Sequence, residues 1–130
     1  MQVQFITAEV FKQHQEEFEN ANFLQTNEIA EVHKSSQFYD EIFYISWTEG
    51  ERWIAQALVC IRRRFRFFKE AVIVQGPLFY LDELSLLPQM LESLEVFLKE
   101  KGISRVEMNP YLMNKVLNES LEVIEECNYP

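Results

Sequence analysis

The chain has 130 residues, of which 48% are apolar and 14% aromatic, and its formal net charge is −9. This length and composition predict one globular domain rather than a disordered chain. The negative charge disfavours nonspecific binding to nucleic acid or to an anionic membrane. No apolar run reaches the roughly 18 to 20 residues of a membrane span.

The N-terminus and the cysteines indicate the compartment. The first residues, Met1-Gln-Val-Gln, lack the features of a signal peptide. Cys60 and Cys127 lack the close spacing of a metal or redox motif. In a reducing cytosol each is expected to be a small buried apolar residue. We therefore expect a cytoplasmic protein with no bound metal.

The first third of the chain predicts one strand and two short helices. The expected bounds are residues 3–6 for the strand and residues 8–20 and 27–35 for the helices. Thr7 is placed to cap the first helix, and Thr26 or Asn27 the second. His14 lies on the apolar face of the first helix. Because it has no partner ligands in the pattern, it is expected at the core boundary rather than in a metal site.

The middle of the chain predicts three antiparallel strands joined by hairpins. Their expected bounds are residues 39–48, 53–67 and 71–74. Glu49-Gly50 and Lys69-Glu70 mark the two turns. Trp47 and Trp53 flank the first turn, and we expect them to pack as a cross-strand pair rather than to form a stacking platform.

A strand–helix–strand unit follows, in which strands 72–74 and 105–108 should lie side by side. The helix between them is expected over residues 86–101, with Gly102 as its left-handed cap. Its apolar face is formed by Leu87, Met90, Leu91, Leu94, Phe97 and Leu98. A last amphipathic helix is expected over residues 113–127.

The order β-α-α-β-β-β-α-β-α predicts an α/β fold, with a mixed sheet that has helices on both faces. This order resembles the acyltransferase fold of the GNAT superfamily without its last two strands. In that topology, a strand that would follow Pro130 pairs with the outer side of strand 105–108. We therefore expect an open sheet edge, which either recruits a second chain to give a homodimer or is covered by the C-terminal helix or an irregular segment.

A basic stripe is predicted on the strand expected over residues 53–67. Arg62, Arg64 and Arg66 share one face of this strand because side chains alternate. The stripe is either a binding surface for phosphate or an RNA backbone, or a solvated strand end that protects an edge from aggregation. The second interpretation is favoured, because hairpin ends are often charged.

Three segments, in this order, resemble the motifs of one protein family. Phe23-Leu24-Gln25-Thr26, followed by His33-Lys34, is similar to an "FLQS…W…K" segment. Gln75-Gly76-Pro77 with Asp82 is similar to "RGP…D", and the strand end Arg105–Pro110 to "R-(hydrophobic)-DP". These are motifs of the Fem family (FemA, FemB, FemX and Mur-type peptidyltransferases), which builds the interpeptide bridge of bacterial cell walls.

The resemblance implies that residues 1–130 form a single GNAT-like domain, corresponding to the N-terminal half of a longer Fem-type transferase. The implied reaction is aminoacyl transfer from aminoacyl-tRNA to the stem peptide of a nucleotide- or lipid-linked peptidoglycan precursor, without a cofactor. The aminoacyl ester is already activated, so positioning and electrostatic support matter more than a protein nucleophile. The absence of a catalytic triad is therefore no objection.

The resemblance also implies where substrate binds, although it identifies no catalytic residue. The implied substrate-binding residues are Gln25, His33, Lys34, Gln75 and Gly76, with Arg62, Arg64 and Arg66 as further candidates. The family lysine that grips the phosphates of the precursor falls on His33 by spacing. Three other positions differ from the family pattern: Gln75 for arginine, Ile29 for an aromatic residue and Asn109 for aspartate.

Two other classes of function remain open. One is a non-catalytic binding or scaffold domain, or a truncated relic of the family. The other is a coenzyme-A-dependent N-acetyltransferase, which is disfavoured because none of the three glycines forms a glycine-rich strand-to-helix turn for the pyrophosphate. No Walker loop, metal-ligand spacing or Gly-x-Ser-x-Gly elbow is present in the sequence.

Overall fold

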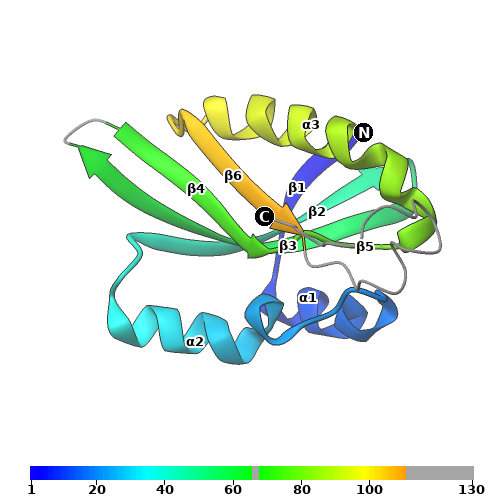
Figure 1. The fold of residues 1–130 in the computed structure, drawn as a ribbon, viewed down its shortest axis with the longest axis horizontal. Coiled ribbons are helices and arrows are strands. Elements are labelled where there is room, and N and C mark those ends of the chain that lie inside the picture. Colours follow the sequence, from blue (N-terminus) through cyan, green and yellow to red (C-terminus); the bar gives the residue numbers. More distant parts are fainter. Residues whose placement is uncertain (66–67, 111–130) are drawn as a thin grey trace, which may run out of the picture.

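The computed structural model describes residues 1–65 and 68–110, which form one mixed β-sheet covered by helices on both faces (Figure 1). The strands are β1 (Gln2–Ile6), β2 (Glu41–Glu49), β3 (Arg52–Phe65), β4 (Phe68–Gln75), β5 (Leu78–Phe79) and β6 (Arg105–Pro110). The α-helices are α1 (Ala8–His14), α2 (Asn27–Ser36) and α3 (Leu87–Lys99). Short 3₁₀ turns are η1 (Gln15–Glu17), η2 (Phe23–Gln25) and η3 (Leu81–Leu86). The predicted α/β class is confirmed, and the helix expected over residues 113–127 lies outside the described residues.

The strands are ordered β1-β2-β3-β4-β6 across the sheet, and β5 pairs with β3. Strands β1 to β4 are joined by antiparallel ladders. Strand β6 runs parallel to β4, with Glu70 opposite Arg105 and Gln75 opposite Pro110. The predicted strand–helix–strand unit is therefore confirmed.

Each face of the sheet has its own hydrophobic layer (Figure 1). On one face α3 buries Met90, Leu94 and Leu98 against β-strand residues that include Ile45, Trp47, Val59 and Ile73. On the other face, residues of the α1 and α2 segments pack on Tyr44, Leu58 and Cys60; they are Phe11, Phe18, Ile29 and Ala30. Leu91, expected on the apolar face of α3, is only half-buried.

Capping interactions set the predicted helix ends. At the start of α1, the Thr7 hydroxyl accepts a hydrogen bond from the Val10 amide at 3.1 Å. At the start of α2, the Thr26 hydroxyl accepts a hydrogen bond from the Ile29 amide at 3.2 Å. Gly102 has φ +80°, as a left-handed cap requires. The first helix is shorter than expected, because its α-helical part ends at His14 and continues as the turn η1.

The predicted pairing of Trp47 with Trp53 is wrong. The ladder places Trp53 opposite Thr48, and neighbouring residues of a strand point to opposite faces. Trp47 is therefore fully buried under α3, whereas Trp53 packs on the α1 side. The Trp47 indole N–H donates to the Met90 carbonyl at 2.9 Å, which ties β2 to α3.

The segment between β4 and α3 contains two short elements, β5 and η3, that the sequence analysis did not predict. The Gly76–Pro77 bond is cis, and the chain then forms β5, which pairs with Ala55 and Gln56 of β3. The turn η3 follows before α3 begins at Leu87. None of the helices among the described residues is long and apolar enough to cross a membrane.

Candidate functional site

Two segments that are far apart in the sequence, residues 20–25 and 75–79, meet at the carboxyl end of β4. The Asn20 amide donates to the Pro77 carbonyl at 3.0 Å and accepts from the Phe79 N–H at 3.1 Å. The Asn22 side chain donates to the Gln75 carbonyl at 2.9 Å. Ligand sites in sheets with crossover helices lie at the carboxyl ends of parallel strands. This junction, beside the ends of β4 and β6, is our candidate site.

Gln25 supports this junction from inside. Its side chain is 1% exposed and bridges two strands. The amide nitrogen donates to the carbonyls of Val74 at 3.0 Å and Leu58 at 3.3 Å, and the amide oxygen accepts from the Leu58 N–H at 2.8 Å. The β3–β4 ladder is paired only as far as Cys60–Val72. Gln25 thus links the two strands where their own pairing has ended.

Gly76 is buried directly against Gln25. A Cβ atom at this position would lie 2.7 Å from Gln25 Cδ and 2.7 Å from Ile73 Cγ2, closer than real Cβ contacts. A residue larger than glycine would therefore have to displace the side chain of Gln25 or Ile73. The "FLQ" and "GP" motifs, 50 residues apart, are parts of one packed unit.

Gly76→Ala is expected to lower the free energy of unfolding by about 1 to 3 kcal/mol, because the added methyl group overpacks this contact. Chemical denaturation measures the change. In a double-mutant cycle with Gln25→Ala, the two changes should couple by about 1 kcal/mol, because shortening Gln25 makes room for the methyl group. Strict additivity would show that Gln25 is not what restricts residue 76.

Gln75 and Asn109 present polar side chains at the ends of the two parallel strands. Gln75 has φ +55°, a conformation that residues other than glycine seldom adopt and that is often found at functional sites. Asn109 lies opposite Val74, and its side-chain oxygen is buried without a hydrogen-bond partner among the described residues. These two side chains are the polar groups of β4 and β6 nearest to the junction.

The structure places His33 and Lys34 elsewhere. Both lie in the last turn of α2, and His33 follows Thr26 by seven residues, or roughly 10 Å along the helix axis. The His33 ring packs edge-on against Tyr39, with 4.9 Å between ring centroids. Lys34 is exposed and its Nζ lies 3.6 Å from a Glu31 carboxylate oxygen. The two residues are therefore at the opposite end of α2 from Gln25.

Arg62 belongs to an ion-pair cluster across three strands. Its Nε lies 3.1 Å from one oxygen of Glu70, which is 2% exposed, and Arg105 Nε lies 3.5 Å from the other oxygen. The Arg64 side chain and Arg66 lie outside the described part of the chain. The β3–β4 ladder is irregular between Arg63 and Phe65. For Arg62, this arrangement favours the structural interpretation of the predicted stripe.

His14 lies at the boundary of the core, as predicted. Its ring stacks on Trp53 with 4.3 Å between centroids, and Nδ1 lies 3.1 Å from Glu17 Oε1. The Tyr80 hydroxyl donates to the same oxygen at 3.0 Å. The hydrogen bond with His14 lowers the pKa of Glu17, and burial raises the pKa of Tyr80. Among the described residues, no group of three or more His, Cys, Asp or Glu could hold a metal ion.

Cys60 is buried as predicted, and burial raises the pKa of its thiol from 9.0 to about 12. Thiolate is the reactive form of cysteine. At pH 8 the thiolate fraction of Cys60 should therefore be about a thousandfold lower than in the unfolded chain. In a Cys127→Ser background, labelling with a thiol reagent should be slow until denaturant is added. Rapid labelling of the native chain would contradict this environment.

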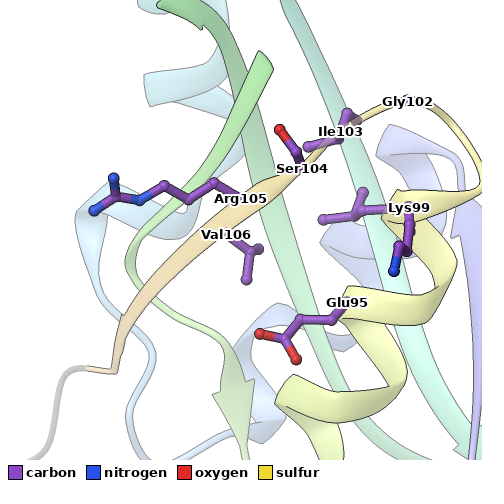
Figure 2. A pocket seen from close by; sticks show the side chains of 8 residues that line it. Glu95, Lys99, Gly102, Ile103, Ser104, Arg105 and Val106 are labelled. Carbon is purple, nitrogen blue, oxygen red and sulfur yellow. The ribbon is translucent and has the colours of Figure 1, made fainter. Parts of the chain in front are cut away.

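A separate open groove of about 510 Å³ lies between the C-terminal end of α3 and the start of β6. Its apolar floor is formed by Leu98, Ile103 and Val106. Figure 2 shows Glu95 and Lys99 of α3 beside this hollow, whereas the Arg105 side chain points away from α3. This α3–β6 groove is at the end of β6 opposite to Asn109, so it is distinct from the junction.

Comparison with known proteins identifies the fold. FemX matches with a TM-score of 0.72 at 15% identity, over 94% of this chain and 30% of the FemX chain. A GNAT family acetyltransferase from Staphylococcus aureus matches with a TM-score of 0.55 at 13% identity, over 88% of this chain and 94% of that one. An aminoglycoside 6'-N-acetyltransferase from Acinetobacter haemolyticus matches with a TM-score of 0.52 at 17% identity, over 96% of this chain and 92% of that one. The predicted GNAT-like fold is confirmed.

The sequence itself identifies the family. No curated protein matches the chain. The model of the FemAB family matches residues 6–129, almost the whole chain, and this range contains all three motifs. The chain therefore belongs to the FemAB family.

Proposed function

We propose that this chain is part of an aminoacyltransferase that acts on a peptidoglycan precursor in the cytoplasm, where aminoacyl-tRNA is available. Membership in the FemAB family supports the proposal. The observation that carries it is the packing of Gln25 on Gly76, which unites two of the family-like motifs at the carboxyl end of β4. The chain spans 30% of the length of FemX, so we propose that it corresponds to one GNAT-like part of a longer transferase.

The proposed reaction is attack of an amine of the stem peptide on the ester carbonyl carbon of aminoacyl-tRNA. An amide bond forms, the ester C–O bond breaks, and the proton lost by the amine ends on the ribose oxygen. The ester supplies the activation, so the protein has to position the two reactants and stabilise the developing oxyanion. In this chain Gln75 and Asn109 are the groups proposed to contact the acceptor, because they lie at the strand ends beside the junction.

Gln75 offers a direct test of substrate binding. The family has arginine at this position, and an arginine binds phosphate more strongly than a neutral amide does. Gln75→Arg should therefore tighten binding of a nucleotide-linked muropeptide by about tenfold, as measured by calorimetry. Gln89→Arg, on the exposed face of α3, makes the same charge change away from the junction and should leave the affinity unchanged. Equal effects of the two substitutions would argue against a site at Gln75.

The same titrations separate the classes of function. We expect the nucleotide-linked muropeptide to bind and acetyl-coenzyme A not to bind, because Gly50, Gly76 and Gly102 form no cradle for a pyrophosphate. We expect no transfer of labelled amino acid from aminoacyl-tRNA by this chain alone, since it spans 30% of FemX. Micromolar binding of acetyl-coenzyme A would instead favour an acetyltransferase. Binding of neither molecule would favour a scaffold domain.

A further inference from the structure

The basic residues of this chain are unevenly distributed. Residues 62–69 and 99–105 contain eight of the 12 basic residues and only one of the 21 acidic residues. The rest of the chain combines four basic residues with 20 acidic ones, so the net charge of −9 conceals a separation of charge. A local concentration of positive charge can attract an anionic partner even to an acidic protein.

The fold brings these two segments to the same end of the sheet. The Lys69 carbonyl accepts a hydrogen bond from the Ser104 N–H at 3.2 Å, and Glu70 lies opposite Arg105 in the parallel pair of β4 and β6. Figure 1 shows the end of β3, the starts of β4 and β6 and the C-terminal end of α3 close together at this end. We call this region the basic end. Its described basic residues are Arg62, Arg63, Lys69, Lys99, Lys101 and Arg105.

Four of these six residues have a structural explanation. Arg62 and Arg105 share the Glu70 carboxylate. Lys99 lies in the last turn of α3, where a positive charge is favourable because the C-terminus of a helix is partially negative. Lys101 Nζ lies over an aromatic ring of α3, 4.6 Å from the ring centroid. These contacts account for the four charges without any ligand.

Arg63 and Lys69 have no such explanation. They lie directly opposite each other in the β3–β4 ladder, on the same face as the neighbouring pair Ile61 and Ala71, which is the α3 face. Like charges at facing positions destabilise a strand pair. The Arg63 backbone N–H donates to Asp40 Oδ2, but neither basic side chain has a hydrogen-bond or ion-pair partner among the described residues. The pair therefore lowers the stability of the free protein.

Two facing cations without a counter-charge can bind an anion between them. The Cβ atoms at facing positions are about 4.5 to 5.5 Å apart, so both side chains can contact one phosphate group. The other positive charges of the basic end extend over two faces of the sheet and a helix end, which is more surface than one phosphate group covers. This arrangement favours a polymer with a repeated phosphate.

We propose that Arg63 and Lys69 bind the phosphate backbone of an RNA and that the basic end is an RNA-binding surface. The choice of RNA among polyanions rests on the proposed function, in which tRNA delivers the amino acid. Gln75, at the junction, follows Glu70 by five residues of β4, or roughly 17 Å. An RNA with its 3′ end at the junction would therefore reach the basic end a few nucleotides further along.

Binding of fluorescently labelled, uncharged tRNA to this chain, followed by anisotropy, tests the proposal. The affinity should fall roughly a hundredfold between about 50 and 200 mM salt, as expected for roughly four phosphate contacts. Arg63→Gln and Lys69→Gln should each weaken binding about tenfold, because each removes a charge-assisted contact. Lys12→Gln makes the same charge change at an exposed position of α1 and should leave the affinity within about twofold.

Unfolding measurements on the same variants separate binding from folding. Each substitution at the facing pair removes one of two like charges, so Arg63→Gln and Lys69→Gln should be at least as stable as the native chain. If the loss of tRNA binding were accompanied by a loss of stability, the pair would have a structural role, and the proposal would be overturned.

Vesicles of equal parts phosphatidylglycerol and phosphatidylcholine distinguish RNA from an anionic membrane as the partner. The chain should bind tRNA and not these vesicles. Binding to the vesicles without binding to tRNA, or binding to neither, would overturn the proposal. Titration with the nucleotide-linked muropeptide tests the site at Gln75 independently, so a negative result with tRNA can be told apart from a failure of the proposed acceptor site.

Discussion

Leu94→Ala is expected to lower the free energy of unfolding by about 2 to 5 kcal/mol. Leu94 is fully buried between α3 and the sheet, where it belongs to the same hydrophobic cluster as Met90, Leu98 and Trp47. Truncation removes apolar contacts and leaves a cavity that the surrounding strands cannot fill. Guanidinium denaturation, followed by circular dichroism, measures the change.

Val96→Ala is the matched control for this substitution. Val96 lies on the same helix but is 59% exposed, so its truncation should change the free energy of unfolding by less than about 0.5 kcal/mol. If the Leu94 variant loses no more than this control, the assignment of the buried face of α3 is incorrect.

Gln25→Ala is expected to lower the free energy of unfolding by about 2 to 4 kcal/mol. The substitution removes hydrogen bonds to both Leu58 and Val74, and it leaves the buried Leu58 N–H without its acceptor. A buried donor or acceptor that loses its partner costs about 1 to 3 kcal/mol. The same denaturation measurement applies.

Two variants separate the hydrogen bonds of Gln25 from its volume. Gln25→Met keeps a side chain of similar size without the amide, so it should lose most of the same stability. Gln89→Ala, at an exposed position of α3, should have almost no effect. A Gln25→Met variant as stable as the native chain would show that packing, not hydrogen bonding, holds β3 and β4 together at this point.

The fold was predictable where a local signal exists. Helix α3 combines an apolar face with Gly102 as its cap, and the hairpin strands alternate clearly, so element type followed from periodicity. Strand β5 has only two residues, too few to show the alternation of apolar and polar residues that identifies a strand. It forms because the chain after β4 pairs with a part of β3 that β4 does not reach. The faces of the two tryptophans depend on a one-residue difference in register, which no local pattern specifies.

The candidate site was predictable only in part. The motifs contain Gln25 and Gly76, but the contact between these two residues is a tertiary feature that the sequence does not show. The Arg62–Glu70–Arg105 cluster was not predicted, because Arg105 reaches Glu70 through the parallel register of β4 and β6. Glu70 is the sequence signal that could have predicted this cluster. It is a charged residue next to a run of apolar strand residues, and a carboxylate that is buried in a sheet is almost always paired with a basic residue.

The separation of the two tryptophans onto opposite faces gives the protein two intrinsic fluorescent reporters. Trp47 is buried in the hydrophobic layer under α3, where its indole N–H donates to the Met90 carbonyl. Trp53 is stacked on His14 and is partly exposed to solvent. A phenylalanine substitution at either position leaves one reporter in place. Loosening of the α3 layer should then red-shift only the Trp47 signal, and detachment of α1 should change only the Trp53 signal, so the two layers can be followed separately during unfolding.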